Sequence, residues 1–95
     1  MRLKAEHIEF LNHSITKYMP DAAIYLIGSR ANDDLKGGDI DILVIGEQKL
    51  SGQQKRNIKL AFYKEAGEQK LDLVSLKHSD PSAFKEFALI DSVKL

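Results

Sequence analysis

Three short apolar segments constrain the fold of this chain more than any other feature of its sequence. They cover residues 22–28 (AAIYLIG), 39–46 (DIDILVIG) and 70–76 (KLDLVSL). Runs of this length that are rich in Ile, Leu and Val are typical of strands buried in a sheet. A chain of 95 residues, 43% of them hydrophobic, has room for one core around such a sheet. We therefore expect residues 1–95 to form a single domain.

Helical patterns precede and separate these segments. Residues 3–19 carry apolar side chains at the 3–4 spacing of a helix with one buried face, and Pro20 would end that helix. Ser51 and Gln54 form the pattern of a capping box, which predicts the start of a second helix. Gly67 is suited to its C-terminal end. The second helix therefore lies between the second and third strand segments.

A third, shorter helix is expected near the C-terminus. Asp80 would be its N-cap and Pro81 its first residue, because proline at that position loses no hydrogen bond. Its side chains expected in the core are Phe84, Phe87 and Ala88. The chain would then finish in a loose end that contains Val93 and Leu95.

The order of these elements predicts an α+β fold with a small mixed sheet of about three strands. The polar link 29–38 between the first two strands is too short for a full crossover and suits antiparallel neighbours. The helix between the second and third strands suits a parallel connection. This topology would bring Gly28, the 39–41 segment and Asp72 to one edge of the sheet.

The residues expected at that edge are suited to holding a metal ion. Asp39 and Asp41 are two apart on a strand, so their carboxylates project from one face, about 7 Å apart. Two anions that close beside apolar sequence need a positive charge between them, and Mg²⁺ or Mn²⁺ supplies it. Asp72 interrupts the third apolar segment as a third carboxylate, which would complete a two-metal site or act as a general base.

A phosphate site is expected beside these carboxylates. Gly28 and Ser29 follow the first buried strand, where glycine permits close approach of a ligand and the next amides and hydroxyl can bind an anion. Arg30 is a further candidate contact to a triphosphate, with a surface role as the alternative. Together the two halves would hold a nucleoside triphosphate for phosphoryl or nucleotidyl transfer.

The motifs Gly28-Ser29-Arg30-Ala31 and Asp39-Ile40-Asp41-Ile42, followed by Asp72, resemble those of the DNA polymerase beta-like nucleotidyltransferase superfamily. The similarity is strongest to its minimal, single-domain prokaryotic members (the MNT group) and extends over about residues 8–76. Asn32 and Asp33 stand where many of those members have Arg and Gly, which makes the expected phosphate site less positive.

This resemblance implies a nucleotidyltransferase fold and a role for each motif residue. Asp39, Asp41 and Asp72 would be catalytic and bind the metal ions, while Gly28, Ser29 and Arg30 would hold ATP. Minimal members commonly pair with a helical HEPN protein, often a ribonuclease toxin, and antitoxin members are thought to transfer AMP to a tyrosine of that partner. The resemblance thus implies AMP transfer from ATP to a hydroxyl on a HEPN-type partner protein.

Two other functions remain open from the sequence. The chain would be a binding module that masks its partner by contact alone, or it would modify a small molecule with an acceptor pocket completed by a homo-oligomer. Fourteen basic and fourteen acidic residues give no net charge, which disfavours extended nucleic acid as a partner. Cysteine is absent, which excludes disulfides and thiol chemistry.

The remaining polar residues are interpreted as surface groups. The three histidines, His7, His13 and His78, lack metal-ligand spacing and are expected to be exposed without a role. The basic residues Lys55, Arg56 and Lys59 are interpreted as a solvated helix face. No apolar run approaches the roughly 20 residues that span a bilayer, so a cytoplasmic location is expected.

Overall fold

Three helices and four strands occupy the part of the chain that the structure describes, residues 3–28, 39–67 and 69–95 of a computed structural model. In order they are α1 (Ala5–Tyr18), β1 (Ala23–Ile27), β2 (Ile40–Gly46), α2 (Gly52–Ala66), β3 (Leu71–Lys77), α3 (Ser82–Leu89) and β4 (Val93–Lys94). The predicted order is confirmed, with one short strand added. The predicted loop at 29–38 lies outside the described residues. No described helix has both the length and the apolar character needed to cross a membrane.

The strands form one mixed sheet in the order β3-β2-β1-β4. β1 pairs with β2 in antiparallel fashion and β2 pairs with β3 in parallel, as predicted. β4 pairs with the other edge of β1, and the N–H of Leu95 donates to the carbonyl of Ile24 at 2.9 Å. The expectation of a loose end at Val93 and Leu95 is therefore wrong. These residues satisfy backbone groups of β1 that would otherwise be unpaired.

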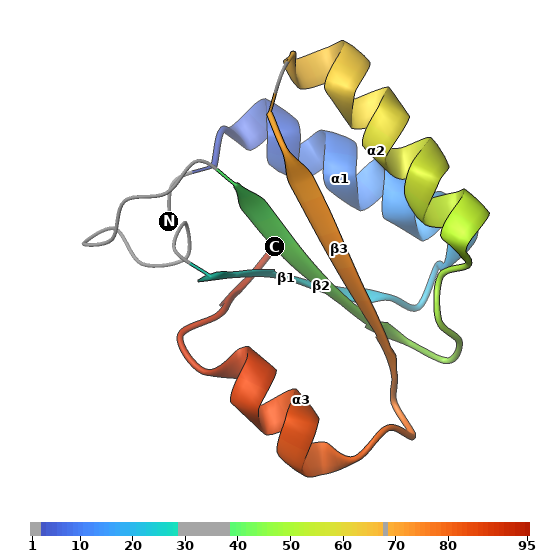
Figure 1. Cartoon of the computed structure of the whole chain (residues 1–95), viewed down its shortest axis with the longest axis vertical. Coiled ribbons are helices and arrows are strands. Elements are labelled where there is room, and N and C mark those ends of the chain that lie inside the picture. Colours follow the sequence, from blue (N-terminus) through green and yellow to red (C-terminus); the bar gives the residue numbers. More distant parts are fainter. Residues whose placement is uncertain (1–2, 29–38, 68) are drawn as a thin grey trace.

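The larger part of the core lies on the face of the sheet covered by α1 and α2 (Figure 1). Alternation along β2 sends Ile40 and Ile42 to this face, where both are fully buried. Phe62 of α2 is also fully buried, and the ring of His7 meets it edge-on with centroids 5.4 Å apart. His7 is thus half-buried against an aromatic ring, and the expectation that it is exposed is wrong.

The opposite face carries α3 and a smaller apolar cluster of Leu43, Ile45 and Leu76. Ala88 packs against it as predicted, together with Leu89. Phe84 and Phe87 are 54% and 76% exposed, so their predicted place in the core is wrong. An eight-residue helix presents only one narrow stripe to so small a cluster, and these two rings lie beside that stripe.

The helix ends follow local hydrogen bonding. The capping box at the start of α2 is confirmed, with the Gln54 N–H donating to Ser51 Oγ at 3.0 Å. Gly67 ends α2 at a φ of 79°, as a glycine is expected to. The predicted cap of α3 is wrong: Asp80 instead accepts a hydrogen bond from the Lys77 N–H at 2.8 Å, and Pro81 is the N-cap. Asp80 therefore closes the turn after β3.

Candidate active site

Three carboxylates lie together at one end of the sheet, where β2 and β3 begin. Asp41 is paired with Asp72 in the parallel register, and Asp39 directly precedes β2. Asp41 alternates with Ile40 and Ile42, which are buried under α1 and α2, so its side chain lies on the face that carries α3. The structure thus brings together the three carboxylates that the sequence analysis predicted to lie at one edge of the sheet.

Asp41 is the carboxylate most affected by its surroundings. Partial burial raises the pKa of its carboxyl group above the ordinary value, and the negative charges of Asp72 and Asp39 raise that pKa further. Lys70 acts in the opposite direction; its Nζ lies 3.8 Å from Asp39 Oδ2, with both side chains exposed. Within residues 3–28, 39–67 and 69–95, three carboxylates and one lysine ion pair leave an excess of negative charge at this end of the sheet. A divalent cation bound by carboxylate oxygens would neutralise it.

Gly28 connects this end of the sheet to the expected phosphate site. Ile27 at the end of β1 pairs with Asp41, which places the following residue beside the carboxylates. A Cβ on Gly28 would lie only 2.6 Å from Asp41 Oδ2, and the φ of Gly28 is +75°. Glycine is therefore required here for both space and backbone conformation. Ser29 and Arg30, the other predicted phosphate contacts, lie outside the described residues.

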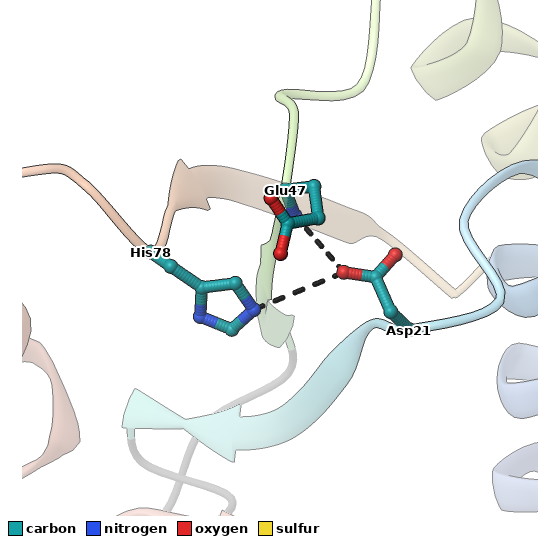
Figure 2. Close-up of side chains that lie close together, drawn as sticks. All are labelled: Asp21, Glu47 and His78. Atoms are coloured by element: carbon teal, nitrogen blue, oxygen red, sulfur yellow. Dashed lines mark hydrogen bonds and ion pairs between the residues drawn. The ribbon is translucent and has the colours of Figure 1, made fainter.

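A second polar cluster lies at the other end of the strands. Asp21 precedes β1, Glu47 follows β2 and His78 follows β3, and Figure 2 shows the three side chains turned toward one another. Their potential ligand atoms lie within 4.8 Å of one another, and all three residues are exposed. One imidazole and two carboxylates are groups that can coordinate a cation such as Zn²⁺.

The contacts inside this second cluster already engage its central member. Asp21 Oδ2 accepts a hydrogen bond from the Glu47 N–H at 3.1 Å and lies 3.8 Å from His78 Nε2. His78 is exposed, as expected, and its one recorded side-chain contact in the described structure is this one with Asp21. The sequence contained one signal for this cluster: each of the three residues flanks a strand, at the end of the sheet opposite Asp39.

The family of the chain follows from comparison with known proteins. The family model described as polymerase beta, nucleotidyltransferase matches residues 9–95. Because the match covers most of the sequence, the chain belongs to this family, as the resemblance of its motifs predicted. The mixed sheet with three helices is the corresponding fold. A search of curated proteins finds no match.

Several solved structures are similar to this chain. A mutant of the toxin–antitoxin pair MntA–HpeT has a TM-score of 0.71 at 22% identity, covering 99% of this chain and 72% of that one. The structure of a tri-AMPylated Shewanella oneidensis HEPN toxin with its MNT antitoxin gives 0.59 at 21% identity, with coverages of 93% and 70%. A protein thought to be a nucleotidyltransferase gives 0.58 at 26% identity, with coverages of 96% and 99%. These similarities support the fold.

Proposed function

We propose that this chain is a metal-dependent nucleotidyltransferase that transfers AMP from ATP to a hydroxyl of a partner protein, in an antitoxin-like role toward a HEPN-type toxin. The observation that carries the proposal is the gathering of Asp39, Asp41 and Asp72 at one sheet end beside Gly28. A cluster of like charges in a nucleotidyltransferase-family domain is a suitable site for a divalent cation. The similar solved structures include complexes of toxin and antitoxin, one with an AMPylated toxin.

Each residue has a defined task in this proposal. Asp39 and Asp41 hold Mg²⁺ or Mn²⁺, with Asp72 as the third carboxylate of the site. The ion, when bound, neutralises phosphate charge. The backbone at Gly28, with Ser29 and Arg30, holds the triphosphate.

The transfer itself requires little covalent participation by the protein. Asp72 accepts the proton of the acceptor hydroxyl while the hydroxyl oxygen attacks the α-phosphorus of ATP. The bond from that phosphorus to the bridging oxygen breaks, and pyrophosphate leaves on the opposite side. The carboxylates therefore act by positioning, charge neutralisation and proton acceptance.

Label transfer from α-labelled ATP to a HEPN-type toxin tests the proposal. Asp39→Ala or Asp41→Ala should reduce the rate by at least about 100-fold, because each removes a ligand of the proposed metal site. Asp21→Ala, at the far end of the sheet, is the matched control and should retain the rate. Undiminished transfer by either active-site variant would contradict the proposal. The mass of the labelled product distinguishes a modified protein from a modified small molecule.

Contact masking is a second candidate function, and the apolar surface of α3 favours it. Phe84, Phe87 and Ile90 are all more than half exposed, which suits a helix that meets another protein. If contact alone inhibits the partner, neutralisation should need no ATP and Asp72→Asn should leave it unchanged. Titration of the toxin's activity with and without ATP separates the two functions.

A further inference from the structure

The strand order indicates from which side an acceptor reaches the site. Gly28 follows β1, Asp41 lies on the neighbouring β2, and Asp72 lies on β3, at the edge of the sheet. In-line transfer requires the attacking oxygen and the leaving pyrophosphate to be on opposite sides of the phosphorus. This step rests on the proposed function, which puts the triphosphate at Gly28. The hydroxyl must then approach past the β3 edge.

A groove lies on that side, between α2 and β3, which stand next to each other in Figure 1. It has a volume of about 360 Å³ and reaches Asp72. Its helical wall is a single stripe of α2 with spacings of three, four and seven residues: Arg56, Lys59, Leu60 and Tyr63. Leu60 and Tyr63 are 56% and 53% exposed, although both are large and apolar. The groove thus has an uncovered apolar wall beside a proposed catalytic group.

The charge of the groove indicates the kind of acceptor that fits it. Arg56, Lys59 and Lys70 contribute three positive groups to its lining, and Asp72 lines it at the β3 edge with a side chain that faces away from α2. A segment with carboxylates would complement this charge. Exposed Leu60 offers a contact that an apolar side chain uses and a nucleic-acid backbone does not. These contacts favour an acidic protein segment over an oligonucleotide.

We infer that this groove is the acceptor-docking surface of the enzyme. It takes an acidic, hydroxyl-bearing segment of a partner protein. Carboxylates of the segment meet Arg56 and Lys59, and an apolar side chain packs on Leu60 and Tyr63. Because β3 is at the edge of the sheet, the hydroxyl passes around that edge to reach the Asp72 side chain on the face that carries α3. The basic residues of α2 therefore have a binding role in addition to being a solvated face.

Fluorescence anisotropy with the full chain tests the docking surface without ATP or metal. The probe is a labelled peptide with one leucine and one tyrosine among glutamates, compared with the same peptide carrying lysines instead. The acidic peptide should bind at least tenfold more tightly, and its affinity should fall as salt rises. The double charge reversal Arg56→Glu/Lys59→Glu should weaken its binding about tenfold. The matched reversal Lys55→Glu/Lys64→Glu, on the same helix outside the groove lining, should leave it unchanged.

Several results would overturn the inference. They are absence of binding, equal affinity for both peptides, equal loss in both double variants, and preferential binding of an oligonucleotide of the same charge. Thermal melts of each variant establish that it is folded. Because peptide binding needs no transfer, its failure is distinct from a failure of the label-transfer experiment, which tests the proposed function.

Discussion

The two ends of the sheet hold polar clusters of opposite character. At one end Asp39, Asp41 and Asp72 lie together, and burial, followed by the negative charges of Asp72 and Asp39, raises the pKa of the Asp41 carboxyl. At the other end, roughly 20 Å away along β2, Asp21 is matched by a backbone N–H and by His78. Among the described residues, Lys70 is the positive group paired with the first cluster, whereas in the second cluster Asp21 has two partners of its own.

This difference shows how a binding site is distinguished from a structural contact. A fold gains nothing from gathering carboxylates, since their repulsion raises the free energy of the folded chain. Such a cluster is accounted for when a cation or substrate supplies the missing charge. At the other end Asp21 accepts a hydrogen bond from the Glu47 N–H and lies near His78, so this carboxylate has partners within the protein.

The largest stability effect is expected from a glycine at the Asp21 end. A Cβ on Gly46 would collide with the buried side chain of Met19. Gly46→Ala should therefore lower the free energy of unfolding by about 1–3 kcal/mol, as overpacking does. Denaturant melts measure this loss. Adding Met19→Ala should recover part of it; a purely additive double variant would show that the collision is not the cause.

The equivalent change at the active-site end should affect function as well as stability. Gly28→Ala forces a side chain toward Asp41 and into a backbone conformation that alanine avoids. We expect it to abolish label transfer, whereas the folded fraction of Gly46→Ala should retain transfer. Equal retention by both variants would mean that the two ends do not differ as described.

A smaller effect is expected when one charge is removed from the active site. Asp41→Asn keeps the shape of the side chain and relieves repulsion from Asp39 and Asp72, so the metal-free variant should melt a few °C higher than the natural chain. Adding Mg²⁺ should raise the melting temperature of the natural chain and not that of the variant. A variant that is less stable than the natural chain without metal would contradict the proposed repulsion.

The pH dependence of that difference has a definite sign. Since the folded-state pKa of Asp41 is raised above 3.8, the folded chain binds the proton more tightly than the unfolded chain. The stabilisation from this proton is present below the ordinary value and is lost as pH rises through the raised pKa. The advantage of Asp41→Asn should therefore be full near neutrality and vanish toward pH 3.8.

The smallest effect is expected at the second cluster. Asp21 and His78 form an exposed pair at 3.8 Å, and such pairs contribute little. Asp21→Asn should change the free energy of unfolding by about 0.5 kcal/mol or less, since the amide oxygen can still accept from the Glu47 N–H. A loss several times larger, measured in denaturant melts, would show that this cluster is more than a surface contact.

The sheet and the carboxylate cluster could be predicted because strand periodicity determines both. Alternation of Asp39 and Asp41 with buried Ile40 specifies which side chains share a face. The short link after β1 predicts an antiparallel neighbour, and the helical connection after β2 predicts a parallel one. The parallel pairing places Asp72 beside Asp41. These inferences depend on local pattern and chain length, which a single sequence contains.

Features that depend on tertiary contacts could not be predicted in the same way. The spacing of Phe84 and Phe87 suits a buried helix face, but the small cluster under α3 leaves both rings exposed. β4 has two residues, too few for a periodic signal. The pair of His78 with Asp21 joins residues far apart in the chain, and only the assembled sheet brings them together.

The parallel register of β2 and β3 gives the site an evolutionary constraint of its own. The connection between Gly46 and Leu71 lies outside the paired strands. Insertions or deletions in it therefore leave the pairing of Asp41 with Asp72 unchanged. One residue inserted between Leu71 and Asp72 would turn the acidic side chain toward the helices α1 and α2. Descendants of this protein can therefore vary their helical connection widely, while a change of spacing within these strands would separate the proposed catalytic carboxylates.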